Sequence, residues 1–572
     1  MSPENRKLDK DSAPNIDRRS FMAYFSAAGL SGTLLPGVLW SELAAAQGNE
    51  ITSEMIQQAE KLAGLEFNDE EREKLTRGVN RLVSNYETLR AVELTNDVPP
   101  ALQFNPVLPG MTFNSERKAI RLSEGPARDV PGDLEEVAFW SVMDLSRAIE
   151  AGKISSVALT KMYLERLKRY DPLLKCVITL TEDLAMKQAR RADDEIDAGK
   201  YRGPLHGIPW GAKDLLAAKG YPTTWGAMPY KDQVIDEDAT VVKRLEEAGA
   251  VLVAKLALGA LALGDIWFGG RTNSPWNPER GSSGSSAGPA CATAAGLVGF
   301  SIGSETNGSI TSPATRCGVT GLRPTFGRVS RHGAMALSWS MDKLGPLCRS
   351  VEDCAVVLDA ICRPDGLDLT VLDLPFNWDA AFDFRKLRVG YVKGGFKSDG
   401  EKQGNNERTL ETLRSLDVDL KPIELPDLPF NAMAFILTVE AAAAFDDLTR
   451  SDRDDELVSQ GAFAWPTTFR RARMVPAVEY IQANRVRTLL MRQMADLMDE
   501  VDVYVTPTLQ NLYLGNFTGH PIISVPNGFT DRGEPTSIGF AGRLYGEAEL
   551  LALAAGYQNA TDHHLRHPTL EA

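Results

Sequence analysis

A stretch rich in glycine and serine between Gly281 and Ser309 constrains this chain more than any other feature. It reads Gly-Ser-Ser-Gly-Ser-Ser-Ala-Gly over 281–288 and Gly-Ser-Glu-Thr-Asn-Gly-Ser over 303–309. Glycine at this density lets the backbone approach a bound molecule and present N–H groups to it. A phosphate-binding loop carries Lys directly after its last Gly, and none follows here, so that interpretation fails. A flexible loop and a nucleophile loop remain.

Two parts of this stretch match the nucleophile elbow Gly-x-Ser-x-Gly, centred on Ser286 and Ser301. An elbow needs a strand before it and a helix after it. The residues over 273–278 do not form a strand pattern, and those after Ser301 make a poor helix. The His residues that could be offered as a base have no matching context: His332, His520, His563, His564 and His567. The sequence therefore disfavours a Ser-His-Asp triad.

Helical patterns alternate with buried-strand patterns from Phe139 onward. Ser155 and Ser156 suit the start of a helix that ends before the Asp-Pro pair at 171–172, and Asp238 suits the start of a helix that stops at Gly249. The apolar run over 251–254 is typical of a buried strand, and further strands are expected over 387–392 and 501–505. Residues 400–500 are expected to be mainly helical, with a last strand and helix near 520–560. This alternation predicts an α/β sheet covered by helices on both faces.

The first 46 residues have the pattern of an export signal. Arg18 and Arg19 precede an uncharged stretch over 20–41, and small residues follow up to Ala46. We expect a twin-arginine signal peptide over 1–46, cleaved near Ala46, and a periplasmic or extracellular protein without stable membrane insertion. An uncleaved N-terminal anchor is the alternative, because the apolar segment is long enough to span a bilayer.

Residues 47–137 are expected to form a helical hairpin followed by an extended strap. Apolar residues over 50–95 recur at helical spacing, and Pro and Gly are frequent over 96–137. The segments over 51–54, 59–65 and 68–72 weakly resemble the small third subunit of bacterial aminoacyl-tRNA amidotransferases.

Charge and cysteine spacing exclude several classes of function. The formal net charge is −15, and no block of Lys and Arg follows the first twenty residues, so no nucleic-acid partner is expected. The six cysteines form no C-x-x-C pair and His is scarce, so no metal site is expected and no cofactor is required. We expect buried free thiols.

Several motifs in order resemble the amidase-signature family. They are the Gly/Ser stretch itself, Gly-Ile-Pro-Trp-Gly-Ala-Lys-Asp over 207–214, Cys-Gly-Val-Thr-Gly-Leu-Arg-Pro-Thr-Phe-Gly-Arg over 317–328, and Met-Asp-Lys-Leu-Gly-Pro over 341–346. The resemblance runs from about Phe139 to about Arg566, and the catalytic domain is placed over 138–568, with a variable helical substrate region at about 400–500. It implies a single large α/β unit around a mixed sheet of many strands.

The resemblance also implies a Ser–cis-Ser–Lys triad. The nucleophile falls on Ser309, the bridging Ser on Ser285, which lies 24 positions earlier, and the base on Lys213. Ser283 and Ala287 replace two glycines of the family pattern, so Ser286 stays open as a substitute for the bridging Ser. The backbone N–H groups of Thr306, Asn307, Gly308 and Ser309 are expected to hold the oxyanion. Asp214, Arg323 and Asp342 are interpreted as structural supports, and His206 as a packed loop residue.

The expected function is hydrolysis of a carboxamide through an acyl-enzyme on Ser309, with a small-molecule or peptide amide as substrate. The alternatives are a glutamine-hydrolysing amidotransferase subunit that works with partners and an inactive scaffold. The amidotransferase subunits carry Arg where this chain has Thr311, which argues against a substrate held there by its carboxylate. Pocket walls are expected in residues 221–236, 430–485 and 508–520, and Phe463, Trp465 and Phe469 are expected to make part of the site aromatic. The sequence is compatible with a homodimer and does not fix the oligomeric state.

Overall fold

The computed structural model describes residues 51–92, 95–396 and 401–571. The signal segment over 1–46 therefore lies outside the described residues. The chain divides into two units, one up to Leu94 and one from Thr95 on, which are described separately.

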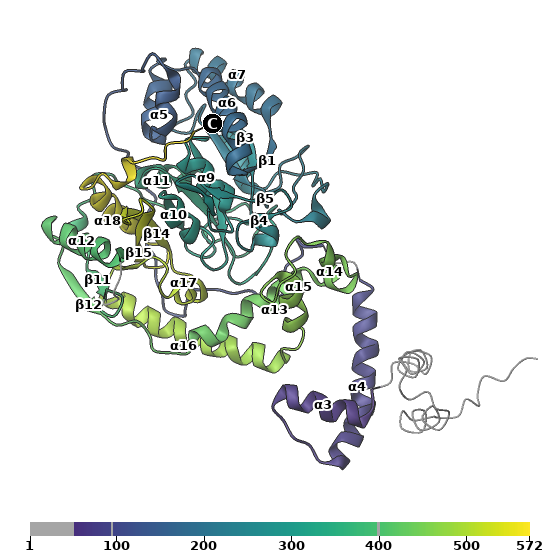
Figure 1. The fold of residues 1–572 in the computed structure, drawn as a ribbon. Coiled ribbons are helices and arrows are strands. Elements are labelled where there is room, and N and C mark those ends of the chain that lie inside the picture. The colour runs from purple at the N-terminus through teal and green to yellow at the C-terminus, as the bar shows by residue number, and fades with distance from the viewer. Residues whose placement is uncertain (1–50, 93–94, 397–400, 572) are drawn as a thin grey trace, which may run out of the picture. The chain divides into compact units, whose positions relative to one another are not determined.

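The described residues of the first unit form the helices α3 (Ser53–Ala63) and α4 (Asp69–Arg90) (Figure 1). The Thr52 hydroxyl caps α3 by accepting a hydrogen bond from the Met55 N–H, and Gly64 ends the helix with a φ of 66°. The guanidinium of Arg72 on α4 lies 2.9 Å from the Glu60 carboxylate on α3.

An eleven-stranded mixed sheet forms the centre of the second unit. Its strands, in spatial order, are β1 (Val177–Leu180), β3 (Val251–Leu256), β2 (Pro209–Lys213), β8 (Phe300–Glu305), β10 (Lys343–Cys348), β9 (Thr320–Arg323), β14 (Ile522–Phe529), β15 (Pro535–Gly542), β13 (Val503–Pro507), β11 (Val389–Val392) and β12 (Leu420–Ile423). Strand β2 runs parallel to both of its neighbours, β3 and β8, whereas β8 and β10 are antiparallel. Two small ribbons, β4–β5 (Ile266–Trp267 and Gly270–Arg271) and β6–β7 (Asn273–Ser274 and Asn277–Gly281), follow β3.

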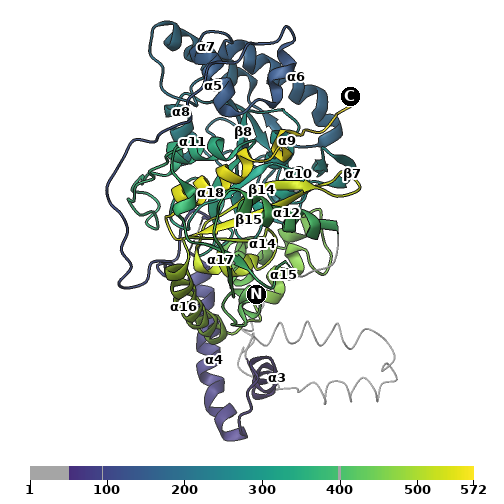
Figure 2. The same ribbon diagram turned by 90° about the vertical axis from the view of Figure 1, so that its left-hand side faces the viewer.

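Helices lie on both faces of the sheet, as expected (Figures 1 and 2). The α-helices of this unit are α5 (Val142–Glu150), α6 (Ser156–Leu174), α7 (Glu182–Asp197), α8 (Thr240–Glu247), α9 (Ala287–Ala294), α10 (Thr311–Cys317), α11 (Val351–Ile361), α12 (Glu401–Ser415), α13 (Phe435–Ala444), α14 (Asp446–Arg450), α15 (Trp465–Ala472), α16 (Ala477–Glu500), α17 (Leu512–Thr518) and α18 (Glu547–Asn559) in the part of the chain that the structure describes. Residues of α5, α8, α11 and α18 form one buried cluster with the sheet, and residues of α7, α9 and α10 form another.

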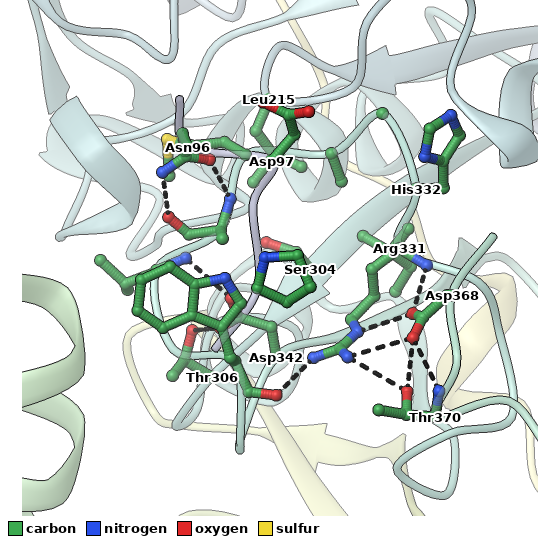
Figure 3. Close-up of a pocket in the computed structure, with 18 of the residues that line it drawn as sticks. Asn96, Asp97, Leu215, Ser304, Thr306, Arg331, His332, Asp342, Asp368 and Thr370 are labelled. Carbon is green, nitrogen blue, oxygen red and sulfur yellow. Dashed lines mark hydrogen bonds and ion pairs between the residues drawn. The ribbon is translucent and has the colours of Figure 1, made fainter. Parts of the chain in front are cut away.

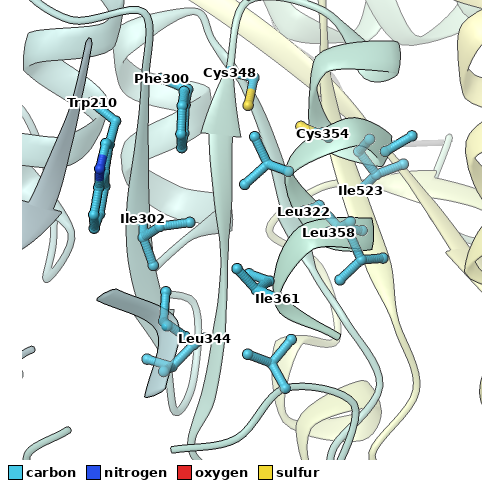
Figure 4. Packing of buried hydrophobic residues seen from close by; sticks show 14 of the residues in the cluster. Trp210, Phe300, Ile302, Leu322, Leu344, Cys348, Cys354, Leu358, Ile361 and Ile523 are labelled. Carbon is cyan, nitrogen blue, oxygen red and sulfur yellow. The ribbon is translucent and has the colours of Figure 1, made fainter. Parts of the chain in front are cut away.

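The larger cluster fixes the position of the central strands. Trp210 on β2 stacks on Phe300 on β8 with ring centroids 5.9 Å apart, and Ile302 extends the same face toward Leu358 on α11 (Figure 4). Because side chains alternate along a strand, this packing turns Gly211 and Lys213 of β2 to the opposite face, on which α9 lies.

Two expected helix boundaries differ from the structure. Ser155 caps α6 as predicted, but the helix continues through Pro172 and ends at Leu174, because a proline in the last turn removes only one backbone hydrogen bond. Asp238 does not cap α8, since its carboxylate accepts a hydrogen bond from the Lys219 N–H at 2.7 Å instead.

Residues 95–133 are a largely extended strap and belong to the same unit as the sheet. The Arg121 N–H donates to the Trp378 carbonyl, and the Ala380 N–H donates to the Arg121 carbonyl, each at 2.8 Å. Within the described residues, none of the helices has both the length and the apolar character needed to cross a bilayer.

Candidate active site

Lys213 is the last residue of β2 and its amine is completely buried. The Nζ atom lies 2.8 Å from the Ser285 hydroxyl, 2.8 Å from the Ser304 hydroxyl and 3.1 Å from the Ser286 hydroxyl. Burial holds the pKa of Lys213 well below its ordinary value, although the negative charges of Asp342 and Glu305 oppose the shift. The structure thus presents a buried amine, with lowered pKa, among three hydroxyls.

Ser285 and Ser286 lie between the β6–β7 ribbon and α9, and the peptide bond between Gly284 and Ser285 is cis. The two hydroxyls differ in their hydrogen bonds. The Ser286 hydroxyl donates to the Ser304 carbonyl and accepts from the Ser304 N–H, both at 3.1 Å, in addition to its contact with Lys213. Among the described residues, the Ser285 hydroxyl contacts Lys213 alone. Ser285 therefore keeps capacity to exchange a proton with a further group, and Ser286 does not.

Ser309 lies in the turn between β8 and α10 and is half-buried. Its carbonyl accepts a hydrogen bond from the Ser286 N–H at 3.1 Å, which holds this turn against the Ser285–Ser286 segment. Gly308 adopts a φ of 89°, a conformation that favours glycine and turns the chain. Within the part of the chain that the structure describes, the N–H groups of Asn307, Gly308 and Ser309 have no acceptor. The turn thus presents free donors beside a serine hydroxyl.

Glu305 fixes the other end of this turn. One oxygen of its buried carboxylate accepts from the N–H groups of Ile310 and Thr311 at 2.9 and 3.0 Å, and the other accepts from Arg323 at 3.0 Å. Burial opposes ionisation, but the charge of Arg323 and the two N–H donors outweigh it and lower the pKa of Glu305 to about 2. Glu305 is therefore a permanent anion that takes up the donors directly after Ser309 and leaves those before it free.

Glu305 and Ser304 were not identified from the sequence as site residues. Both stand in the motif that ends at Ser309, and an acidic residue within so neutral a run was the available signal for Glu305. Ser304 had no signal of its own, since a Ser in a Gly/Ser stretch is unremarkable until the fold places it against Lys213.

Asp214 and Asp342, which were expected to be structural supports, each bind another side chain of the protein. Asp214 lies 2.6 Å from Lys255 in a buried ion pair, and Asp342 accepts from the Thr306 hydroxyl at 2.6 Å. His206 is buried in its loop and its Nε2 lies 3.2 Å from Glu195. Thr311 donates to Glu305 from a fully buried position, so this position faces the protein interior and not a substrate.

The two elbow patterns differ in the structure. Contrary to expectation, residues 273–281 contain β6 and β7, so a strand precedes Ser286 and α9 follows it, but the Ser286 hydroxyl is bound by Lys213 and the Ser304 backbone. Ser301 lies within β8, and its buried hydroxyl donates to the Pro289 carbonyl at 2.9 Å. His332 lies 3.2 Å from Glu237, and His520 is buried, with its Nδ1 2.9 Å from the Thr518 hydroxyl. Burial lowers the pKa of His520 to about 3. Neither imidazole contacts a candidate serine.

Of the three aromatic residues expected in the site, two belong to the core. Trp465 and Phe469 stack with ring centroids 4.9 Å apart in the larger buried cluster, and the Trp465 N–H donates to the Leu261 carbonyl at 2.9 Å. Phe463 is 86% exposed and does not join them.

A cavity of about 160 Å³ lies next to the candidate site and is lined on one side by Ser304 and Thr306 (Figure 3). Its other walls come from the strap over 96–103, the segment over 331–344 and the segment over 367–370. All six cysteines are free and buried, and no group of three or more His, Cys, Asp or Glu side chains in the described ranges could hold a metal ion.

Comparisons with known proteins identify the family and the fold of the chain. The family model described as Amidase matches residues 158–513. A glutamyl-tRNA(Gln) amidotransferase subunit of Roseiflexus sp. (strain RS-1) is 34% identical over 479 residues, which is 75% of this chain and 98% of that protein. The native peptide amidase from Stenotrophomonas maltophilia is 30% identical with a TM-score of 0.68, over 77% of this chain and 100% of that one. An amidase family protein from Bacillus anthracis str. Ames is 25% identical with a TM-score of 0.70, over 76% and 93% of the two chains.

Proposed function

The chain belongs to the amidase family, the amidase-signature proteins, and from this premise we propose that it hydrolyses a carboxamide C–N bond through an acyl-enzyme on Ser309. The observation that carries the proposal is the position of the Lys213 amine, buried and 2.8 Å from a Ser285 hydroxyl that has no other partner among the described residues. A lysine can act as a base only when it is neutral, and the lowered pKa of Lys213 supplies that condition.

The proton path follows from the hydrogen bonds. In the structure the Lys213 amine donates toward the hydroxyls of Ser285, Ser286 and Ser304. In the proposed reaction the neutral amine has one lone pair and two N–H donors, so its lone pair accepts from Ser285 while its N–H groups donate to Ser286 and Ser304. When Ser309 attacks the amide carbon, its proton passes to Ser285 while the Ser285 proton passes to Lys213. The serine hydroxyl, a weak nucleophile, is activated only at the moment of attack.

The negative charge that develops on the amide oxygen is held by backbone donors. The N–H groups of Asn307, Gly308 and Ser309 are free among the described residues, and Glu305 keeps the turn in place by binding the next two N–H groups. Each such donor contributes on the order of 3 kcal/mol to lowering the barrier. The C–N bond then breaks as Lys213 returns the proton through Ser285 to the leaving nitrogen.

Water completes the reaction. It attacks the ester carbonyl on Ser309, loses a proton to Lys213 through Ser285, and releases the carboxylic acid as Ser309 regains its proton. The balance is one amide and one water to one carboxylic acid and one amine or ammonia. A panel of primary and secondary amides with the purified chain tests the proposal, with carboxylate release and acyl-adduct mass as readouts. The absence of any turnover and any adduct on folded protein would count against hydrolysis and favour an inactive scaffold.

A glutamine-hydrolysing amidotransferase subunit is the second candidate, because relatives at 34% identity bear that name. A net charge of −15 argues against a partner complex that binds tRNA. Affinity purification of the tagged chain from its host distinguishes the two candidates. Stoichiometric partner subunits and glutaminase activity support the second, and a free chain that hydrolyses other amides supports the first.

We further propose that residues 1–46 direct export by the twin-arginine route, and that the mature chain starts near Gln47. The support is the Arg18–Arg19 pair followed by an uncharged stretch and small residues. N-terminal sequencing of the protein from the native host, with Arg18→Lys/Arg19→Lys as the control, checks this. We expect a mature N-terminus near residue 47 outside the cytoplasm for the natural sequence and retention of the variant inside. An intact N-terminus in the cytoplasm would contradict the proposal.

The two adjacent serines are expected to respond differently to substitution. Ser285→Ala removes the group that relays the proton, so we expect kcat/KM to fall by about 10²- to 10⁴-fold with little change in thermal stability. Ser286→Ala removes buried hydrogen bonds with Ser304, so we expect a loss of about 1–3 kcal/mol in unfolding free energy and a smaller loss of activity. Kinetics and thermal melting of both variants check this, and the reverse pattern would assign the relay to Ser286.

A further inference from the structure

We propose that the strap segment Asn96–Gln103 is a wall of the substrate site and selects uncharged amides that carry one compact apolar group, of about the size of a phenyl ring. This inference rests on the proposed function and adds a substrate class to it. The strap lies outside the residues that match the family model, 158–513.

The cavity places the strap opposite residues that adjoin the proposed catalytic groups, although Lys213, Ser285 and Ser309 are not themselves among its lining residues. Ser304, whose hydroxyl lies 2.8 Å from the Lys213 amine, and Thr306, three residues before Ser309, line one side of it. The strap lines another side with Asn96, Pro99, Pro100, Leu102 and Gln103. Figure 3 draws Asn96 and Asp97 of the strap in the same cavity as Ser304 and Thr306. A group bound under the strap therefore lies against the residues that hold Lys213.

The cavity offers no free positive charge among the residues that the structure describes. The Arg331 guanidinium donates to both oxygens of Asp368, to the Thr370 hydroxyl and to the Trp339 carbonyl. His332 lies 3.2 Å from Glu237. A carboxylate on the substrate would enter without a partner, at a cost of several kcal/mol if it is fully buried.

The negative charges of the cavity act in the same direction. The Asp342 carboxylate is occupied by the Thr306 hydroxyl and by the N–H groups of Leu337 and Ser338. Asp97 on the strap is exposed at the rim. Both repel a substrate carboxylate and neither is placed to pair with an arginine-like group in the interior, so the preferred substrate is uncharged.

The volume of the cavity and its apolar wall residues indicate which apolar substrate group it accepts. The walls contain Leu215, Ala262, Met335, Leu337, Trp339, Leu344, Leu367 and Leu369. Other lining residues are polar, among them Ser304, Thr306 and Asp342. An apolar cavity of about 150 Å³ holds benzene, and this one measures about 160 Å³, so its apolar part suits a phenyl or branched aliphatic group.

The strap is attached at both ends of the segment. The Asn96 amide donates to the Ala336 carbonyl at 3.0 Å and accepts from the Ala336 N–H at 2.7 Å. The Phe104 ring packs on Phe326, with centroids 5.0 Å apart, and the Arg487 guanidinium carbon lies 3.6 Å from its centroid. Residues between these attachments are held over the cavity by the chain on either side.

The test modifies the strap chemically and compares two substrates. Leu102 lines the cavity and is 83% exposed, whereas Val98 is 47% exposed on the same strap and is not part of the lining. Because all six natural cysteines are buried, Leu102→Cys and Val98→Cys each provide one reactive thiol. Each variant is treated with N-phenylmaleimide and compared with its own untreated form. The probes are a methyl fluorophosphonate and a phenyl-bearing fluorophosphonate, and the readout is the rate of Ser309 modification by intact mass.

We expect maleimide treatment of the Leu102→Cys protein to slow its reaction with the phenyl-bearing probe by about tenfold or more, the scale of losing an apolar contact in a pocket. Reaction with the methyl probe, and both reactions of the Val98→Cys protein, should stay unchanged. The natural protein should also react faster with the phenyl-bearing probe than with its carboxylate analogue. Equal slowing of both probes, or no slowing, would overturn the role of the strap while leaving the proposed hydrolase intact. If Ser309 of the natural protein reacts with neither probe, the proposed function itself fails and the strap proposal with it.

Discussion

Ser309→Ala is expected to abolish both amide hydrolysis and modification by a fluorophosphonate. Loss of a nucleophilic serine lowers kcat by on the order of 10⁶-fold where the nucleophile and base act as a unit. The proposed unit is Ser309, Ser285 and Lys213. The Lys213 amine lies 2.8 Å from the Ser285 hydroxyl, and a hydrogen bond from the Ser286 N–H to the Ser309 carbonyl holds the two serine segments together. The measurement is intact-mass analysis after probe treatment, together with steady-state kinetics.

Ser312→Ala is the matched control for this variant. Ser312 lies three residues further on, in α10, and its hydroxyl contacts Ser283 at 2.8 Å, away from Lys213. We expect it to keep the adduct and most of the activity. An adduct that persists in Ser309→Ala and maps to Ser286 or Ser301 would move the nucleophile and reopen the histidine triad.

Lys213→Met is expected to lower kcat/KM by about 10²- to 10⁴-fold, the range that a positioned base contributes. Methionine has a similar length and no charge, so the buried site stays filled while its proton acceptor is lost. Circular dichroism and thermal melting of the variant control for folding. Activity close to that of the natural protein in a folded variant would exclude Lys213 as the base.

The same residue sets the pH dependence. Burial lowers the pKa of Lys213, so the amine is protonated and inactive below that pKa and neutral above it. We therefore expect kcat/KM to rise with pH through the pKa of Lys213 and then reach a plateau. In Lys213→Met the residual activity should lose this acidic limb. An acidic limb that is the same in both proteins would show that another group controls it.

Much of the sheet could be predicted because its strands carry local signals. The apolar run over 251–254 forms the first four residues of β3, since a strand covered on both faces needs apolar residues at nearly every position. The Val alternation over 501–505 overlaps β13, which starts two residues later, at Val503, and ends at Pro507. The helix boundaries were harder to predict, because they depend on single hydrogen bonds with residues that are distant in the sequence. Asp238 has a side chain suited to a helix cap, but its carboxylate accepts a hydrogen bond from the Lys219 N–H instead.

The candidate triad could be predicted because its motifs have fixed spacing, and the structure brings Lys213 and Ser285 within 2.8 Å of each other. The choice between Ser285 and Ser286 could not be made from residue types, which are identical. The 24-residue spacing favours Ser285, and the structure supports this preference, because the Ser304 backbone binds the Ser286 hydroxyl whereas the Ser285 hydroxyl bonds Lys213 alone among the described residues. For Trp465 and Phe469 the prediction was wrong. Their aromatic character suggested a place in the substrate site, but both rings pack in the buried core.

The position of the strap over 96–103 beside the candidate site could not be predicted from the sequence. Its Pro-rich composition predicts an extended course, but the direction of that course depends on one amide, Asn96, and one ring, Phe104. Neither residue type has a recognisable spacing to the motifs over 281–309.

Strand β2 is hydrogen-bonded to a parallel neighbour on each side. Lys213 pairs with Leu256 of β3, and the three residues before it pair with β8, so the main chain at Lys213 is held by the ladders of its strand. The strap, by contrast, is held by side chains at its two attachment points. The strand that carries Lys213 is thus fixed by main-chain hydrogen bonds, whereas the strap over 96–103 is open to replacement. An engineer could replace the strap by another segment of equal span and change which amides are accepted, while the proton chemistry behind it stays the same.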